Sequence, residues 1–144
     1  MLTIDTFLAS DRDAWERLFR AYIDFYKRAL PDEECERAWR RLQAGKEIHG
    51  CGARDDQNLV GIAHFLTHAH TNAADVCYLQ DLFTDPNARG RGAGRALIEH
   101  VAAWAGEHGC SQLYWRTHES NTTARALYDR VAEHRGFIVY QRDL

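Results

Sequence analysis

The chain has 144 residues, of which 45% are hydrophobic and 27% charged, and its net charge is −3. This length predicts one domain, residues 1–144, with a core large enough to be stable. The negative net charge argues against non-specific nucleic-acid binding, which needs a basic surface, and no apolar run approaches the ~20 residues that cross a bilayer.

The apolar pattern predicts strands and helices in the order β-α-α-β-β-β-α-β-α-β. The first helix carries an aromatic stripe from Trp15 to Tyr26, and the second follows Pro31 and stops near Gly45. The expected strands are Leu2–Leu8, His49–Arg54, Leu59–His70, Val76–Thr84, Gln112–Thr117 and Phe137–Arg142, and the later helices are 92–108 and 122–133. This order predicts an α/β fold, a mixed sheet flanked by helices with parallel pairing in the C-terminal half.

The most informative motif is the glycine- and arginine-rich run Arg89–Arg95, between a strand and a helix. Glycines there let backbone N–H groups converge at a helix N-terminus, where the helix dipole also favours an anion. The arginines add donors suited to phosphate oxygens, so the run predicts a ligand that bears a pyrophosphate. The spacing does not fit a P-loop, because Gly94 is followed by Arg95 and Ala96. It also fails the dinucleotide fingerprint, whose last glycine would fall at Arg95 or Leu97.

The pattern that fits is Arg/Gln-x-x-Gly-x-Gly/Ala, with Arg89, Gly92 and Gly94. With this motif the chain resembles the GNAT superfamily of acetyl-CoA-dependent N-acetyltransferases. A second signature of that family, Asn-x-x-Ala-x-x-Leu-Tyr, fits the segment Asn121–Tyr128. Gly136-Phe137 then begins a last strand, as in the family. The resemblance is strong over residues 76–140.

The resemblance implies how acetyl-CoA is held. In the family, the strand before the glycines and the next strand splay apart, and the pantetheine arm lies in the gap. The backbone from Leu82 to Thr84 would pair with the acetyl and pantetheine amides, and a backbone N–H near Phe83, where the family strand bulges, would hold the oxyanion. Asn121 would bind the pantetheine arm, or act only as a helix N-cap. The full expected coenzyme-binding set is Leu82, Phe83, Thr84, Arg89, Gly90, Arg91, Gly92, Ala93, Gly94, Arg95 and Asn121.

Two side chains are expected to carry the chemistry. By the resemblance, Tyr128 donates a proton to the departing thiolate; the alternative is that Tyr128 is only a core residue. Asp81 is the preferred base for the attacking amine, with Glu119 as second choice. Related enzymes often carry a carboxylate pair here, but Gln80 replaces its first member. The alternative for Asp81 is a carboxylate that is merely hydrogen-bonded at a bulge.

The four cysteines are scattered and lie outside the motifs, without an evident histidine partner. Direct attack in a ternary complex is therefore expected, not a covalent acetyl-enzyme. Widely spaced cysteines and the lack of a signal-peptide pattern also favour a cytoplasmic protein with reduced thiols. His64, His68 and His70 share strand parity, but no further ligand stands at a recognised spacing, so no metal is expected. Substrate-side or solvent-facing positions are the alternatives for these histidines.

The expected acceptor is a primary amine: a small amine, a polyamine or a lysine-like group. One or two of Tyr22, Phe25 and Tyr26 are expected to touch it. An acidic acceptor side would suit a cation, and the alternative is ordinary solvated helix faces; the acids are Asp24, Asp32, Glu33, Glu34 and Glu36. Two other functions stay open, a non-catalytic acyl-CoA-binding module and a nucleotide-binding enzyme such as a kinase. The seventh strand of the family is missing after Phe137, and a homodimer is one way to cover the sheet edge.

Overall fold

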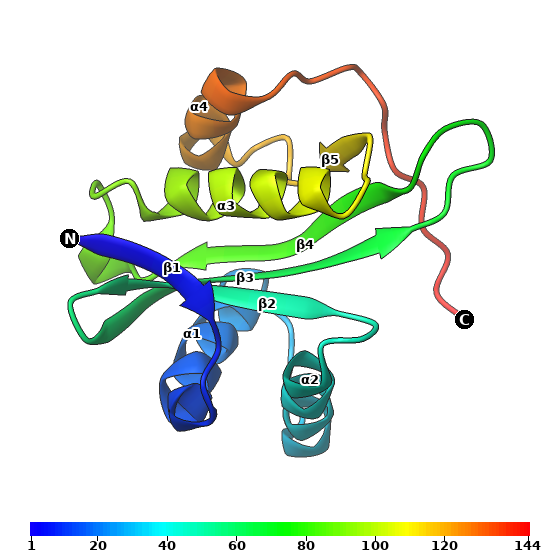
Figure 1. Ribbon diagram of the computed structural model, residues 1–144. Helices are drawn as coiled ribbons and strands as arrows, with labels where there is room; N and C mark the ends of the chain where they lie inside the picture. Colours follow the sequence, from blue (N-terminus) through cyan, green and yellow to red (C-terminus); the bar gives the residue numbers. More distant parts are fainter.

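The computed structural model describes residues 1–144 and contains one five-stranded sheet (Figure 1). The strands are β1 Leu2–Thr6, β2 His49–Asp55, β3 Asn58–His68, β4 Val76–Thr84 and β5 Gln112–Tyr114. They lie side by side in chain order. The first four are antiparallel, and β5 is parallel to β4. The predicted mixed α/β sheet with C-terminal parallel pairing is therefore confirmed.

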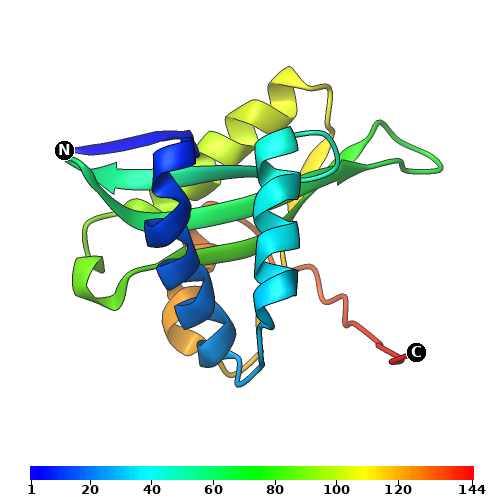
Figure 2. The same cartoon turned by 90° about the horizontal axis from the view of Figure 1, so that it is seen from below.

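Helices cover both faces of the sheet. They are α1 Arg12–Phe25, α2 Asp32–Ala44, α3 Ala93–Glu107 and α4 Thr122–Val131. Helices α1 and α2 lie under one face, and α3 and α4 lie over the other (Figures 1 and 2). None of the helices combines the length and the apolar character needed to cross a lipid bilayer.

Helix α2 shows how local sequence fixes an element. Pro31 stands just before its first turn, where a missing N–H costs nothing. Gly45 ends the helix with a φ of +61°, and its N–H donates to the carbonyl of Arg41 at 3.0 Å. Only glycine adopts that backbone conformation without strain, so the predicted stop near Gly45 is confirmed.

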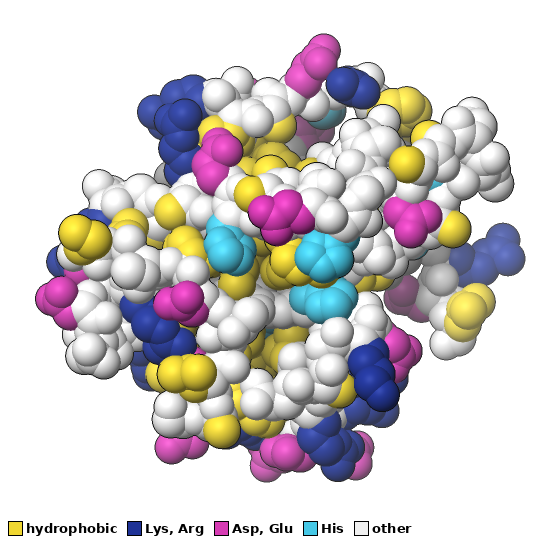
Figure 3. All heavy atoms as spheres, viewed as in Figure 1, with side chains coloured by type: hydrophobic (Ala, Val, Ile, Leu, Met, Phe, Trp, Pro, Cys, Tyr) yellow, Lys and Arg dark blue, Asp and Glu magenta, His cyan; other side chains and the backbone are white.

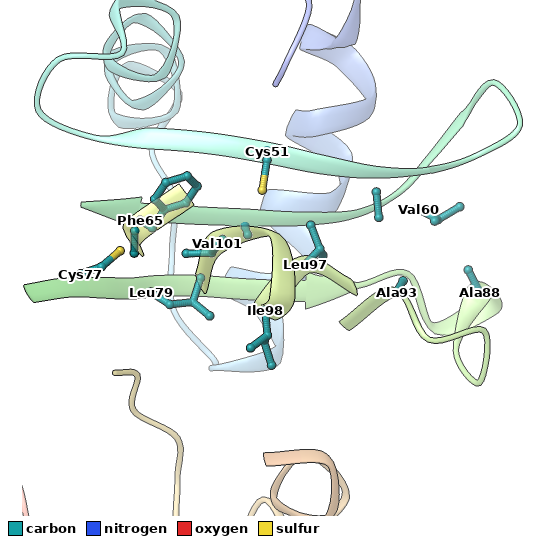
Figure 4. Close-up of a cluster of buried hydrophobic side chains, with 13 residues drawn as sticks. Cys51, Val60, Phe65, Cys77, Leu79, Ala88, Ala93, Leu97, Ile98 and Val101 are labelled. Atoms are coloured by element: carbon teal, nitrogen blue, oxygen red, sulfur yellow. The ribbon is translucent and has the colours of Figure 1, made fainter. Parts of the chain in front are cut away.

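Two apolar clusters, one on each face, hold the helices to the sheet. The cluster under α3 joins Leu97 and Val101 to strand residues such as Cys51 and Leu79 (Figure 4). The cluster on the other face gathers around Trp15, which is fully buried between α1, α2 and the sheet. Each fully buried large side chain stabilises the fold by about 1.5–3 kcal/mol. The sheet is therefore a firm platform between the two helix layers.

Strand β4 has two irregularities that matter for the site. Opposite β3, Asp81 pairs with His64 and Leu79 with Phe65, so Gln80 is an extra residue in a β-bulge. On the other side, β4 pairs with β5 only from Val76 to Tyr78. Beyond Tyr78 the two strands diverge, which leaves the backbone of the rest of β4 without a strand neighbour there.

The expectation of a C-terminal strand is wrong. Residues 132–144 contain no helix or strand, although a strand was expected over Phe137–Arg142. A strand needs a neighbour with free backbone groups along its length, and β5 has three residues where six were expected. Large apolar side chains of the segment are exposed as a result; they are Phe137, Ile138, Val139 and Tyr140.

Candidate active site

A cavity of about 550 Å³ lies where the C-terminal end of α1, the end of β4, the loop before α3 and helix α4 meet. Every predicted coenzyme-binding residue except Arg91 lines it, together with Tyr128. Those lining residues are Leu82, Phe83, Thr84, Arg89, Gly90, Gly92, Ala93, Gly94, Arg95 and Asn121. Residues from three separate sequence motifs are thus brought to one hollow.

The loop at one end of this cavity is shaped by two glycines. Gly90 and Gly92 have φ values of +83° and +82°, a conformation that side chains strongly disfavour. Gly92 is the residue before α3, and no side chain caps that helix. The first-turn N–H groups of α3 are therefore left for an outside acceptor, and the helix dipole favours an anion there. The geometry fits the diphosphate of coenzyme A.

The three arginines of this loop do not behave alike. Arg89 and Arg95 line the cavity and form no ion pair within the chain. Arg91 instead pairs with Asp55 at the turn between β2 and β3, so its guanidinium is already engaged. The side chain of Arg91 therefore does not line the cavity, and its expected contact with the coenzyme stays a prediction. Its partner is distant in sequence, and no local pattern could reveal it.

Helix α4 closes over the loop because Gly94 has no side chain. A Cβ at Gly94 would lie 3.3 Å from Cδ2 of Leu127 and 3.8 Å from Oγ1 of Thr84. The start of α4 is fixed by Asn121, whose Oδ1 accepts from the N–H of Ala124 and whose Nδ2 donates to Thr117. Asn121 is therefore a helix N-cap, and it also lines the cavity.

Tyr128 lies half-buried in the wall of the cavity. Its ring meets that of Trp115 edge to face at 5.4 Å. Burial, with a smaller effect from Tyr26, raises the pKa of Tyr128 to about 12. The hydroxyl thus keeps its proton at physiological pH, as a group that donates a proton must.

Asp81 is held from below by a buried histidine. Oδ2 of Asp81 lies 2.9 Å from Nδ1 of His64, and Nε2 of His64 accepts from the indole N–H of Trp15 at 2.9 Å. An indole N–H can only donate, so Nε2 must be the acceptor. The hydrogen-bond network therefore assigns the proton of His64 to Nδ1, where it is donated to Asp81.

The histidine under Asp81 was not identified from the sequence. His64 was grouped there with His68 and His70 by strand parity, with substrate-side or solvent-facing positions as the readings. It is 2% exposed, beneath Asp81, whereas the ring of His68 meets the hydroxyl of Tyr114 at 2.8 Å. The pairing of β3 with β4 sets this arrangement, and the bulge at Gln80 decides which residue faces His64. The signal that could have revealed this pair is a histidine and a carboxylate on two consecutive strands, His64 and Asp81, which pair across a hairpin.

Three aromatic residues at the C-terminal end of α1 line the cavity: Tyr22 and Phe25 in the helix, and Tyr26 just after it. The hydroxyl of Tyr22 lies 3.5 Å from the carbonyl of Gln80. Burial raises the pKa of the Tyr22 phenol well above its usual range, and the negative charge of Asp81 raises it further. The phenol of Tyr22 is therefore neutral, and Asp81 itself is not among the residues that line the cavity. Glu119, the second candidate base, is exposed and outside the cavity lining.

Most of the acidic residues expected on the acceptor side are engaged elsewhere. Three of them form ion pairs with arginines, namely Asp32 with Arg20, Glu34 with Arg37 and Glu36 with Arg12. These pairs lie on α1 and α2 and offer little free negative charge to a ligand. The reading as ordinary helix faces describes these three residues better.

A second, smaller cavity of about 270 Å³ opens at the β2 edge, among Phe7, His49 and Trp104. Histidine side chains gather on this face of the molecule (Figure 3). His49 and His108 flank the ring of Trp104, with centroids 4.7 and 4.0 Å away. The structure has no group of three or more His, Cys, Asp or Glu side chains that could hold a metal ion.

Comparison with known proteins agrees with this geometry. Residues 13–132 match the family model described as the acetyltransferase (GNAT) family. The chain is 33% identical over 137 residues to D-amino-acid N-acetyltransferase HPA3 of Saccharomyces cerevisiae, covering 92% of this chain and 85% of that protein. It is 31% identical over 134 residues to the uncharacterized N-acetyltransferase YhfO of Bacillus subtilis, covering 91% and 90%.

Solved structures share the fold at lower identity. The aminoglycoside acetyltransferase AAC(6')-Iy, in complex with a bisubstrate analogue of coenzyme A, superposes with a TM-score of 0.87 at 20% identity, covering 100% of this chain and 99% of that one. The family match spans most of the chain, and the yeast relative is similar over nearly its whole length. The chain therefore belongs to the GNAT family and is an acetyl-CoA-dependent N-acetyltransferase.

Proposed function

We propose that this enzyme transfers the acetyl group of acetyl-CoA to a primary amine by direct attack within a ternary complex. The observation that carries the proposal is the continuity of the cavity, which runs from the N-terminus of α3 to Tyr22 and Tyr26 at the C-terminal end of α1. One end suits a diphosphate, and the other lies beside the carboxylate of Asp81. The D-amino acids for which the yeast relative is named also present a primary amine.

The coenzyme would be held mainly by backbone groups. The N–H groups from Arg91 to Arg95 would take the diphosphate, with the guanidinium groups of Arg89 and Arg95 beside it. The unpaired edge of β4 from Leu82 to Thr84 would pair with the amides of the pantetheine arm, as an added strand does. This arrangement would bring the thioester to the bulge in β4. Residues 1–144 would act as one acetyltransferase domain.

The transfer needs two proton movements. As the amine nitrogen bonds to the acetyl carbon and the carbon–sulfur bond breaks, Asp81 takes the proton of the amine, directly or through water. Tyr128 gives its proton to the sulfur of the leaving thiolate. Backbone N–H groups of β4 between Gln80 and Phe83 would stabilise the oxyanion; one such donor contributes about 3–4 kcal/mol.

The base is needed because the acceptor is mostly protonated. A lysine-like amine with a pKa of ~10.4 is neutral about once in 10³ molecules at pH 7, a deficit of roughly 4–5 kcal/mol. The Nδ1–H of His64 binds one oxygen of Asp81, which supports this role because the other oxygen would remain for the amine.

The test is release of coenzyme A from acetyl-CoA across amines, amino acids and lysine peptides, with mass detection of the acetylated product. At least one amine is expected to be acetylated without an acetylated protein intermediate. A thermal-shift comparison of acetyl-CoA, ATP and NAD accompanies it. Stabilisation by ATP alone would point to the kinase-like alternative, and binding of acetyl-CoA without turnover on any acceptor would point to a sensing module.

Two further expectations belong to this proposal. The free cysteines are compatible with a cytoplasmic location. A homodimer is proposed because β5 and the exposed apolar run from Phe137 to Tyr140 have no partner in the chain, and unpaired edges favour association. Light scattering at assay concentration tests it, and a monomer alone would remove the dimer from the proposal.

A further inference from the structure

The guanidinium of Arg116 is held beside β4 by a hydrogen bond but has no carboxylate partner. Its Nε donates to the hydroxyl of Tyr78 at 2.9 Å, and its guanidinium carbon lies 5.8 Å from the centre of that ring. Arg116 is exposed and forms no ion pair with any carboxylate of the chain. The two Nη groups are therefore free, while the Nε contact fixes where they stand.

The ring of Tyr78 under Arg116 belongs to a stack of aromatic side chains. The ring of Tyr78 stacks on that of Tyr114 at 4.8 Å, with 25° between the planes. The hydroxyl of Tyr114 in turn meets Nε2 of His68 at 2.8 Å. A charged side chain on such a stack loses less freedom on binding than a flexible surface arginine, so it can recognise an anion at lower entropic cost.

Tyr78, which holds Arg116, and Asp81 point to the same face of the sheet, because their partners on β3, Leu66 and His64, are two positions apart. The pKa of Tyr22, whose phenol is half-buried, is raised by burial and then by its neighbours Asp81, Tyr26 and Tyr78. The hydroxyl of Tyr22, 3.5 Å from the carbonyl of Gln80, reaches the same stretch of β4. Two residues of β4, Leu79 and the bulged Gln80, separate Tyr78 from Asp81, and the matching span on β3 is about 7 Å.

The separate carboxylate of Asp81 and guanidinium of Arg116 suit a ligand that carries one positive and one negative group. Asp81 and Arg116 form no ion pair with each other, so each is free for a separate group of one molecule. An amino acid has an ammonium group and a carboxylate, and guanidinium groups bind carboxylates through two parallel hydrogen bonds. A polyamine would gain nothing from the cation of Arg116.

We propose that the acceptor is an amino acid whose carboxylate is bound by Arg116, with Tyr78 positioning the guanidinium, while its amine faces Asp81. This inference rests on the proposed function and narrows its acceptor class. The ion pairs of Asp32, Glu34 and Glu36 with arginines agree with it, because they remove the acidic cluster that a polycation would need.

The experiment compares matched acceptors on the full chain. Each amino acid of a panel, in both enantiomers, is assayed beside its carboxamide and its decarboxylated amine; methionine, methioninamide and 3-(methylthio)propylamine form one such set. The wild type is expected to show a kcat/KM about 10- to 100-fold higher for the best amino acid than for its carboxamide. An equal or greater kcat/KM for the carboxamides would overturn the inference while leaving the proposed function intact.

Arg116→Gln supplies the decisive comparison. It is expected to lower kcat/KM for the amino acid about 10- to 100-fold, mainly through a higher KM. The kcat/KM for the decarboxylated amine and the KM of acetyl-CoA should stay unchanged. The matched control is Arg40→Gln, which removes another exposed arginine without an ion pair, on α2. This change should leave the kcat/KM of both acceptors unaltered. An equal loss for amino acid and amine in Arg116→Gln would mean a structural role and refute carboxylate recognition. Failure of every acceptor in the wild type would overturn this inference together with the proposed function.

Discussion

Trp15 and His64 meet in the core between α1 and the sheet, with the indole N–H donating to Nε2 of the imidazole at 2.9 Å. This one contact determines which imidazole nitrogen carries the proton, because the indole has no acceptor atom to offer. The proton on Nδ1 then points to Asp81. A core tryptophan thus sets the hydrogen-bonding role of a residue at the edge of the cavity.

His64→Phe is expected to lower kcat at least tenfold while leaving the KM of acetyl-CoA unchanged, because loss of a hydrogen bond to a carboxylate costs about 1.5–3 kcal/mol. The measurement is steady-state kinetics with both substrates varied. His108→Phe, which changes an exposed histidine on the other face, is the control.

His64→Phe also leaves the indole N–H of Trp15 without an acceptor, so a lower melting temperature is expected. Trp15→Phe separates the two effects. It keeps His64 but removes the indole N–H, so either ring nitrogen of His64 can carry the proton. Its kcat should fall less than that of His64→Phe. Unchanged kcat in folded His64→Phe would show that His64 does not position Asp81.

Tyr128→Phe is expected to lower kcat by about 10² or more, with less than a threefold change in the Kd of acetyl-CoA, because only the proton donor is lost. The pKa of Tyr128 is raised to about 12, so its hydroxyl stays protonated below that value. The wild-type rate should therefore show no alkaline decline from Tyr128 up to about pH 10. Stopped assays across pH and calorimetric titration give both quantities.

Tyr140→Phe, which removes the hydroxyl of an exposed tyrosine in the C-terminal segment, is the control for Tyr128→Phe. Equal turnover in Tyr128→Phe and wild type would refute the acid role. A rise in the Kd of acetyl-CoA to match the loss of kcat would instead make Tyr128 a binding residue.

Much of the fold could be predicted from the sequence because its signals are local. The aromatic stripe from Trp15 to Tyr26 marks the buried face of α1, and Pro31 and Gly45 bracket α2 through backbone rules that need no tertiary partner. The glycines before α3 are equally local, since their positive φ values shape the loop whatever surrounds it. The residues that line this end of the cavity could therefore be predicted one by one, while their contacts with the coenzyme stay a prediction.

The acceptor side was less predictable because it depends on pairing across the sheet. The contact of His64 with Asp81 needs the β3–β4 register and its bulge, which no periodicity encodes. Arg116 and Tyr78 meet only because β5 runs parallel to β4. For Phe137–Arg142 a strand was predicted that does not form. Its residues favour a strand, but they have no neighbouring strand to pair with.

The cysteines are expected to be chemically inert in the folded enzyme. Cys51 and Cys77 are buried, and burial raises the pKa of each thiol to about 12, so the reactive thiolate is scarce at pH 8. Iodoacetamide at pH 8 should label Cys110 first, because it is half-buried, and the buried Cys35, Cys51 and Cys77 only after unfolding in urea. Mass spectrometry of peptides reads the order. Detection of an acetylated cysteine during turnover would contradict direct attack.

The ion pair of Asp11 with Arg54 is expected to stabilise the fold in a pH-dependent way. Hydrogen bonds from Arg54 lower the pKa of Asp11 despite its burial. A carboxyl whose folded pKa is depressed contributes stability above its unfolded pKa of ~3.9, and that contribution disappears as the pH falls through the folded pKa. Asp11→Asn should therefore cost about 1–3 kcal/mol of unfolding free energy at pH 7 and less near pH 3.

Urea unfolding of wild type and Asp11→Asn at several pH values measures this difference. Asp56→Asn is the control, since Asp56 is exposed at a turn with a positive φ that asparagine also tolerates. A cost that stays constant from pH 7 to pH 3 would show that Asp11 acts through packing and not through its charge.

Gly94→Ala tests the coenzyme end of the cavity against a matched glycine of the same helix. The added Cβ would lie 3.3 Å from Cδ2 of Leu127, so α4 must shift slightly and the cavity narrows where the first N–H groups of α3 are exposed. The Kd of acetyl-CoA is expected to rise about tenfold, a loss of ~1.4 kcal/mol.

Gly106→Ala lies near the other end of α3, where an added Cβ meets nothing within 4 Å. That change should raise the unfolding free energy by about 0.5–1 kcal/mol through helix propensity and leave the Kd unchanged. Gly94→Ala gains the same helix propensity, but the close contact with Leu127 offsets part of that gain in unfolding free energy. The stability of this variant should therefore stay near that of the wild type. Weaker binding with unchanged stability can then arise only at the cavity. If both alanine variants bound acetyl-CoA as tightly as the wild type, the diphosphate would have to lie away from the N-terminus of α3.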